Sequence, residues 1–347
     1  MRKTLFLLIP SLTGGGAEKV FLNLCKHLNK DKYDITLCLL EKKGEYLSFL
    51  DESIKVHSMD VQRVRYAILP LIRFIKTTKP DILLSTLGHL NALMGFIKPL
   101  LPKETTLIAR EANIVSKMRY NFVVKFLYSK YYANFDWVIG QSDDMINDLK
   151  KVTSINKDRI IKINNPINLE NIERNLLDKN ASLLKNDKIN LVTVGSLTYQ
   201  KGYDLLLRTF SKFRNIEDYH LTILGKGELK EELIQLAKNL KIDTNVSFLG
   251  FKINPYGYME QADIFISSSR FEGFPNAVLE ALACNTPVIA NSYPGGIKEI
   301  INHSIYGEVI NIEDSSQLEK ACFNLSKNKT SKSNIIREKI VERYNIE

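Results

Sequence analysis

Residues 4–18 read TLFLLIPSLTGGGAE, an apolar run that passes through three glycines into a helix-forming segment. The run Thr4–Pro10 predicts a buried strand. The segment after the glycines places four apolar residues on one face of a helix: Val20, Phe21, Leu24 and Leu28. A second apolar run, Ile35–Leu40, follows that helix. This order of strand, glycine turn, amphipathic helix and strand predicts a parallel sheet covered by helices.

The same alternation continues along the first half of the chain and then starts again. Three more strands are expected before the break, at Ile82–Thr86, Thr106–Ala109 and Trp137–Gly140. The segment Asn164–Ile167 (NNPI) breaks the pattern, and Asn168–Asp187 is polar and poor in strand formers, which predicts an interdomain linker. After it, strands are expected at Ile189–Val194, Leu221–Leu224, Val246–Leu249, Ile264–Ser267 and Val288–Ala290, and helices at Asp204–Phe213, Leu229–Leu240 and Phe274–Cys284.

The predicted fold is therefore α/β, with two tandem Rossmann-like, doubly wound domains that face a central cleft. We place the first domain at residues 1–168 and the second at residues 188–328, and we expect residues 329–347 to form a C-terminal helix that can pack back toward the first domain. In such sheets, ligands bind at the carboxyl ends of the strands.

Length, composition and charge agree with this reading. The 347 residues suit two domains, and 44% hydrophobic with 25% charged residues is normal for a soluble protein. No segment reaches the roughly 20 apolar residues of a membrane span. The four cysteines form no CxxC pair, which favours reduced core residues of a cytoplasmic protein. Residues 1–165 carry 26 Lys and Arg against 16 Asp and Glu, so the first half is either ordinarily lysine-rich or faces an anionic partner.

Two glycine loops follow predicted strands. Gly14–Gly16 opens a predicted helix, where the close approach of the backbone and the helix N-terminus favour binding of an anion. A plain turn and a dinucleotide-binding site are the alternatives. Lys19 stands where the dinucleotide fingerprint has its third glycine. The second loop contains Gly195–Ser196–Leu197 and then Gln200–Lys201–Gly202. Lys201 can contact phosphate oxygens there, and an ordinary surface lysine is the alternative.

The segment 270–280, RFEGFPNAVLE, is the most specific. Glu272 follows a strand, Pro275 suits a first helical turn, and Glu280 is expected about two turns into the helix. Eight helical positions span about 12 Å, wider than the roughly 5 to 9.5 Å between a glycosidase's two carboxylates. Two separate hydroxyl anchors are therefore expected, with the amides of Gly273–Asn276 between them facing a diphosphate. A solvated glutamate beside a capping one is the alternative.

In chain order, these motifs resemble the retaining glycosyltransferases of the GT-B fold, the family 4-like or group 1 enzymes. The resemblance also includes the turn Gly225–Lys226–Gly227 and the loop Gly295–Gly296, and it covers essentially the whole chain. The run from Asn254 to Met259 looks most like bacterial enzymes that extend lipid-linked or surface polysaccharides, such as lipopolysaccharide, O-antigen or capsule, including N-acetylgalactosaminyltransferases.

The resemblance implies roles for individual residues. Glu272 and Lys201 would be catalytic, Glu272 holding hexose hydroxyls and Lys201 the diphosphate, while Glu280 would hold the ribose. The implied donor-binding residues are Gly15, Gly16, Gly195, Ser196, Lys201, Gly225, Gly273, Phe274, Pro275, Asn276 and Glu280. Many relatives have arginine in place of Ser196, and histidine where this chain reads Arg110–Glu111–Ala112–Asn113. No metal or other cofactor is implied.

The resemblance thus predicts transfer of a hexose or N-acetylhexosamine from a nucleotide-sugar, most simply a UDP-sugar, to a lipid-linked or glycan acceptor with retention of configuration. A non-catalytic nucleotide-sugar-binding partner subunit, and an epimerase or hydrolase on the same fold, are the alternatives. No nucleic-acid module is recognised.

The segment Lys117–Tyr132 (KMRYNFVVKFLYSKYY) combines basic and aromatic residues and contains no acid. It predicts either a core-facing helix with a solvated basic face or a surface helix that rests on anionic lipid through Lys117, Arg119, Lys125 and Lys130. The second reading predicts a cytoplasmic protein that is peripheral at the inner face of the plasma membrane.

Overall fold

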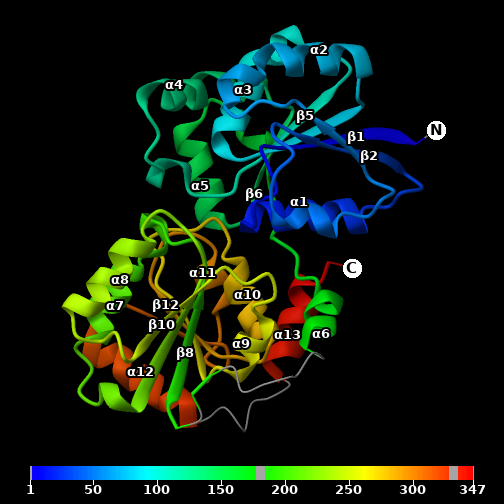
Figure 1. The fold of residues 1–347 in the computed structure, drawn as a ribbon. Coiled ribbons are helices and arrows are strands. Elements are labelled where there is room, and N and C mark those ends of the chain that lie inside the picture. Colours follow the sequence, from blue (N-terminus) through cyan, green and yellow to red (C-terminus); the bar gives the residue numbers. More distant parts are fainter. Residues whose placement is uncertain (1, 177–183, 186, 328–334, 347) are drawn as a thin grey trace. The chain divides into compact units, whose positions relative to one another are not determined.

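A computed structural model describes residues 2–176, 184–185, 187–327 and 335–346 of the chain (Figure 1). The chain divides into two compact units, residues 1–165 and 166–346. Parts of the expected linker (177–183 and 186) and of the expected C-terminal helix (329–334 and 347) lie outside the described residues.

The first unit is built on a seven-stranded sheet in the order β3-β2-β1-β4-β5-β6-β7, with every neighbouring pair parallel. Its strands are β1 (Lys3–Ile9), β2 (Tyr33–Leu39), β3 (Lys55–Ser58), β4 (Ile82–Thr86), β5 (Thr106–Arg110), β6 (Trp137–Gly140) and β7 (Ile160–Lys162). Its α-helices are α1 (Gly16–His27), α2 (Ile68–Thr78), α3 (Gly88–Ile97), α4 (Phe122–Tyr131) and α5 (Asp143–Val152).

The side chains of β1 alternate between two cores, one on each face of this sheet. Leu5, Leu7 and Ile9 pack with α1 on one face. Phe6 and Leu8 pack on the other face with α2, α3 and α4. Figure 1 shows α1 on one side of the sheet and α2 and α3 on the opposite side. The expectation of a parallel sheet covered on both faces is confirmed.

The second unit repeats this design with six parallel strands in the order β10-β9-β8-β11-β12-β13. Its strands are β8 (Ile189–Val194), β9 (Tyr219–Leu224), β10 (Val246–Gly250), β11 (Ile264–Ser267), β12 (Val288–Asn291) and β13 (Gly307–Ile310). Its helices are α6 (Leu169–Leu176), α7 (Tyr203–Phe210), α8 (Lys230–Asn239), α9 (Tyr256–Gln261), α10 (Asn276–Ala283), α11 (Ile297–Ile300), α12 (Ser315–Lys327) and α13 (Ile335–Tyr344). The strand order reverses between β8 and β11, so the loops that follow these two strands diverge and leave a crevice there.

Two helices refine the expected boundaries. The polar stretch assigned to the linker contains α6, whose Ile172 packs into a core of the second unit. Helix α13 packs on α10 and buries Ile336, Ile340 and Tyr344 in that same core. A bridge between Ile167 and Asn345 joins the two ends of this unit. The described contacts of the C-terminal helix therefore hold it on the second unit. Among the described residues, no helix has both the length and the apolar character needed to cross a bilayer.

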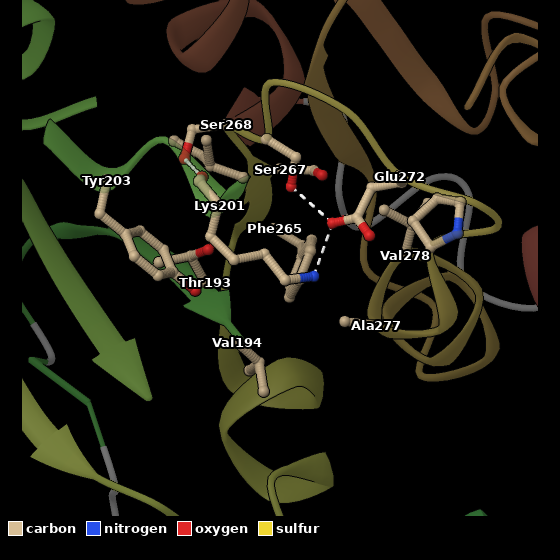
Figure 2. A pocket seen from close by; sticks show the side chains of 13 residues that line it. Thr193, Val194, Lys201, Tyr203, Phe265, Ser267, Ser268, Glu272, Ala277 and Val278 are labelled. Carbon is tan, nitrogen blue, oxygen red and sulfur yellow. Dashed lines mark hydrogen bonds and ion pairs between the residues drawn. The ribbon is translucent and has the colours of Figure 1, made fainter. Parts of the chain in front are cut away.

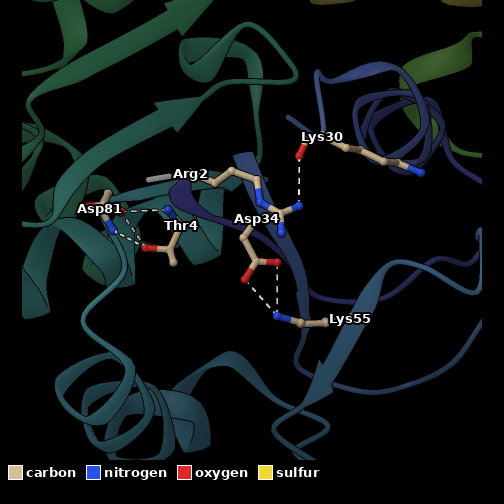
Figure 3. A network of polar contacts seen from close by, with 6 residues as sticks. All are labelled: Arg2, Thr4, Lys30, Asp34, Lys55 and Asp81. Carbon is tan, nitrogen blue, oxygen red and sulfur yellow. Dashed lines mark hydrogen bonds and ion pairs between the residues drawn. The ribbon is translucent and has the colours of Figure 1, made fainter. Parts of the chain in front are cut away.

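A polar network ties β1 to β4, where the strand order of the first sheet reverses (Figure 3). The Asp81 carboxylate accepts hydrogen bonds from the Thr4 amide (2.7 Å) and hydroxyl (2.8 Å). The Asp81 amide in turn donates to the Thr4 hydroxyl at 2.9 Å. The bonds from Thr4, the amide first, lower the pKa of Asp81. Nearby, Lys55 pairs with Asp34 at 2.8 Å across β2 and β3.

Asp81→Ala is expected to lower Tm at pH 7. Because the folded-state pKa is depressed, this contribution is present above the unfolded pKa of about 3.9 and is lost as the pH falls through the folded value. The deficit in Tm should therefore shrink on acidification, which calorimetry over a pH series measures. Asp34→Ala, which removes an exposed ion pair, is the control and should change Tm little. A deficit that is the same at all pH values would contradict the assignment.

Candidate functional site

The crevice at the carboxyl ends of β8 and β11 holds a small pocket (Figure 2). Its walls come from the end of β8, the loop and first turn that lead into α7, the end of β11 and the start of α10. Lys201, Glu272 and Pro275 line it together with Ser267–Ser269. Three of the residues singled out from the sequence thus lie in one place.

Lys201 and Glu272 form an ion pair at the centre of this pocket, with 2.6 Å between Nζ and Oε1. Glu272 is only 6% exposed, and a buried carboxylate needs charged or hydrogen-bonding partners. It has three donors: Lys201 Nζ and Ser269 Oγ (2.7 Å) on Oε1, and Gln200 Nε2 (3.0 Å) on Oε2. The carboxylate is thereby fixed in orientation by residues from two different loops.

The hydroxyls around this carboxylate stay neutral. Burial, and after it the negative charge of Glu272, holds the pKa of Tyr293 well above its ordinary value, and its hydroxyl lies 2.9 Å from Ser267 Oγ. Burial also raises the pKa of Tyr203, which lines the pocket. Both phenols can serve as hydrogen-bonding groups, while Lys201 and Glu272 carry the charges.

The Pro294–Gly296 loop docks directly on the segment that carries Glu272. The Glu272 amide donates to Pro294 O, and the Gly296 amide donates to Gly273 O, both at 3.1 Å. Gly295 has a φ of 130°, and a Cβ there would lie 2.1 Å from Glu272 O. Only glycine permits this approach. The Gly295–Gly296 loop thus supports the backbone of the segment that carries Glu272.

Helix α10 begins at Asn276, with Pro275 at the N-cap position, so the segment from Glu272 to Pro275 is not helical. Glu280 therefore lies about one turn into the helix, whereas about two turns were expected. The Phe274 ring packs into the core and lies 5.6 Å from the Tyr344 ring, which leaves its backbone as the part that can face a ligand. Neither Asn276 nor Glu280 lines the pocket that holds Lys201.

The other donor-loop residues lie beside the pocket without lining it. Gly195 follows β8, and its amide donates to Leu224 O at 3.0 Å. The neighbouring Leu197 amide donates to Lys226 O at 2.9 Å, which joins this loop to the turn that begins at Gly225. Ser196, which stands where many relatives have arginine, is exposed.

In the first unit, Gly15 is the N-cap residue of α1 and Gly16 its first residue, as expected for a loop that opens a helix. The residue that follows β5, Glu111, does not lie in an open loop. Glu111 is buried and accepts hydrogen bonds from Asn91 (2.7 Å), Tyr128 (3.2 Å) and Tyr132. Desolvation raises its pKa. This residue belongs to a closed polar network within the unit.

The residues that orient Glu272 were given no role from the sequence, although Gln200 belongs to the second glycine loop. Ser269 and Gln200 are small or uncharged polar residues in loops, and nothing in their own spacing marks them. Their only signal is proximity in the chain to Glu272 and Lys201. Within the described ranges, no group of three or more His, Cys, Asp or Glu residues gathers in a way that could hold a metal ion.

Comparison with known proteins places the chain in a family. The model described as Glycosyltransferase Family 4 matches residues 14–171, and the model described as Glycosyl transferases group 1 matches residues 176–342. The N-acetylgalactosamine-N,N'-diacetylbacillosaminyl-diphospho-undecaprenol 4-alpha-N-acetylgalactosaminyltransferase of Campylobacter jejuni is 30% identical over 329 residues, which is 90% of this chain and 87% of that relative. The chain belongs to the group 1 glycosyltransferases.

Further relatives of this glycosyltransferase agree. The amylovoran biosynthesis glycosyltransferase AmsD of Erwinia amylovora is 24% identical over 307 residues, 88% of this chain and 85% of the relative. The crystal structure of Anabaena HepE in complex with UDP has a TM-score of 0.79 at 18% identity, over 99% of this chain and 96% of that one. The glycosyltransferase therefore has the GT-B fold, as the sequence motifs implied.

Proposed function

We propose that this glycosyltransferase moves a hexose or N-acetylhexosamine from a UDP-sugar to a lipid-linked or surface-polysaccharide acceptor, with retention of configuration. The observation that carries the proposal is the Lys201–Glu272 pair, 2.6 Å apart in a pocket beside the start of α10. A cation suits the diphosphate, and a fixed carboxylate suits sugar hydroxyls. The name of the Campylobacter relative specifies a diphospho-undecaprenol acceptor, and HepE was crystallised with UDP, which supports both halves of the proposal.

Each residue of the site has a proposed task. Lys201 and the backbone of Gly273–Asn276 bind the diphosphate, because amides at a helix N-terminus favour an anion. Glu272 accepts hydrogen bonds from hexose hydroxyls and Glu280 from the ribose. In the first domain, Gly15 and Gly16 bring backbone close to the donor phosphate. Gly195, Ser196 and Gly225 complete the donor loops.

In the proposed reaction, the bond between the anomeric carbon and the β-phosphate oxygen breaks while the acceptor hydroxyl oxygen bonds to the same face of that carbon. UDP leaves with the bonding electron pair, and the hydroxyl proton passes to the departing phosphate. Lys201 and the helix-start amides stabilise the negative charge that develops on this leaving group. Exclusion of water prevents hydrolysis of the donor.

A panel of UDP-sugars, incubated with the protein and a lipid-linked acceptor extract and analysed by mass spectrometry, tests the activity. We expect one or a few donors to give an acceptor product heavier by one hexose or N-acetylhexosamine, and Lys201→Ala to give none. Tight binding of UDP without any product would instead assign the chain as a non-catalytic nucleotide-sugar-binding subunit. Conversion of the donor without acceptor would indicate an epimerase or hydrolase.

Binding measurements separate the roles of the three charged residues. Lys201→Ala and Glu280→Ala should each weaken UDP binding about 5- to 150-fold, because each loses a hydrogen bond to a charged group worth roughly 1 to 3 kcal/mol. Glu272→Gln should keep UDP affinity or raise it, because Lys201 is then free of its carboxylate partner, and should lower turnover. Calorimetry with folded variants reads the affinities. A loss of UDP affinity in Glu272→Gln equal to that in Lys201→Ala would show that the roles are wrongly assigned.

We further propose that the protein works in the cytoplasm as a peripheral protein at the inner face of the plasma membrane. Helix α4 buries Tyr128 but exposes Phe122 (82%), Val123 (62%) and Phe126 (44%). Basic side chains accompany them at Lys125 and Lys130 on the helix and at Lys117 and Arg119 before it. Exposed apolar residues interleaved with cations suit an anionic lipid surface.

Co-sedimentation with vesicles tests this membrane proposal. Each cation near an anionic surface contributes about 1 kcal/mol, so binding should require anionic lipid and weaken at high salt. Glutamine at Lys117, Arg119, Lys125 and Lys130 should abolish it, whereas glutamine at four exposed lysines on other elements of the same unit should not: Lys103, Lys150, Lys151 and Lys157. Binding that ignores lipid charge, or no binding at low salt, would contradict the proposal.

A further inference from the structure

A second charged pair, outside the pocket, links the loop after β11 to the start of α7. Arg270, three residues after β11, meets Asp204 in the first turn of α7 through two parallel hydrogen bonds of 2.8 and 2.7 Å. The guanidinium also lies 4.2 Å from the centre of the Tyr199 ring and donates to Tyr199 O at 2.8 Å. Neither Arg270 nor Asp204 lines the pocket that holds Lys201 and Glu272.

The backbone around this pair is joined as closely as the side chains. The Arg270 amide donates to Gln200 O at 2.7 Å, and Ser268 Oγ donates to Lys201 O at 2.8 Å. Gly202 has a φ of 65°, and a Cβ there would lie 2.2 Å from Ser268 O. Loop 196–202 and loop 268–273 therefore pack backbone against backbone.

Both members of this pair are charged, Arg270 as a guanidinium and Asp204 as a carboxylate. The hydrogen bonds that Arg270 donates to the Asp204 carboxylate raise the pKa of Arg270. Burial alone would raise the pKa of Asp204, but the hydrogen bonds and the positive charge of Arg270, together with the backbone amides of Asp204 and Leu205, lower that pKa. Two parallel hydrogen bonds from a planar guanidinium to a carboxylate fix the relative orientation of the two groups, and the stacked aromatic ring further restricts the guanidinium. This contact fixes the distance between the loops more tightly than a single hydrogen bond could.

A donor that binds as proposed above competes for both partners of the Lys201–Glu272 pair. The diphosphate draws Lys201 Nζ, and hexose hydroxyls occupy Glu272, so the ion pair that joins the two loops inside the pocket is lost. We propose that Arg270 and Asp204 are positioning residues that keep the phosphate-binding loop and the hexose-binding loop in register once the donor has separated Lys201 from Glu272. The inference rests on the proposed function of the site.

Kinetics of matched variants test the inference. Arg270→Gln and Asp204→Asn should each lower kcat with the UDP-sugar that the wild type uses by about 10- to 100-fold, the effect of a small misplacement of catalytic groups. Each should weaken UDP binding no more than Lys201→Ala does. The double variant should be no worse than either single one, because both remove the same contact. Arg270→Lys, which keeps the charge but cannot form the two parallel hydrogen bonds, should lower kcat nearly as much as Arg270→Gln.

The control is Arg337→Gln, which removes a different arginine–carboxylate pair of the same unit, with Glu173 at 2.6 Å, and should leave kcat unchanged. The effect of Arg270→Gln in a Glu272→Gln background separates a positioning role from a purely structural one. If Arg270 acts through the register of Glu272, Arg270→Gln should cost little in a Glu272→Gln background. An equal fall of kcat in both backgrounds, or a fall that Arg337→Gln reproduces, would overturn the proposal.

Hydrogen exchange measures the register without any turnover. In the ligand-free Glu272→Gln protein, whose Lys201 has lost its carboxylate partner as it would in the donor complex, Arg270→Gln should speed exchange at the amides of residues 198–204 and at residue 270 at least several-fold, while strands β8 and β11 keep their protection. Unchanged exchange in these loops would overturn the inference even where UDP-sugar turnover is found. Faster exchange in a protein that turns over no UDP-sugar would instead leave the register role standing and remove the proposed transferase chemistry.

Discussion

The buried carboxylate of Glu272 is the constraint on which the proposed donor site depends. A charge that is 6% exposed persists only where charged and hydrogen-bonding partners replace water, and removal of such a partner is costly. Its donors come from residues 200, 201 and 269, so the loops after β8 and β11 must meet at this point. The same contact places a cation beside a carboxylate, and the proposed function uses the cation for the diphosphate and the carboxylate for sugar hydroxyls.

The sheet explains why these loops can meet at all. Strands β8 and β11 are neighbours in the sheet although 73 positions separate their carboxyl ends, Val194 and Ser267. The chain passes through β9 and β10 before it reaches β11. Parallel pairing brings both ends to one edge, and the reversal of strand order opens the crevice. Glycines then set the fine spacing, since Gly202 and Gly295 allow backbone contacts on Ser268 and Glu272 that a Cβ would block.

Much of this fold could be predicted from the sequence, because buried parallel strands read as apolar runs between helical patterns. The strands at Ile82–Thr86, Trp137–Gly140, Ile189–Val194 and Ile264–Ser267 match their predicted bounds. The edge strands β3, β7 and β13 were missed, because they are three or four residues long and only partly buried. Helix α6 was taken for linker because its apolar residues are few, and packing on the second unit stabilises it.

The site was predictable in its residue types but not in its contacts. Local spacing marked Glu272 and Lys201, yet their pairing across 71 positions depends on the sheet, as does the fork of Arg270 on Asp204. Glu280 was placed one turn too deep because the segment before Asn276 is a loop that a proline caps. Side-chain contacts between distant loops leave no periodic trace in a sequence, so they emerge only from the folded chain.

A crystal structure of the protein with UDP tests the central claim most directly. The account predicts a diphosphate between Lys201 Nζ and the amides of Gly273–Asn276, with Glu280 at the ribose hydroxyls and Glu272 left to face the position of the sugar. UDP bound elsewhere, with the Lys201–Glu272 pair unchanged, would contradict it.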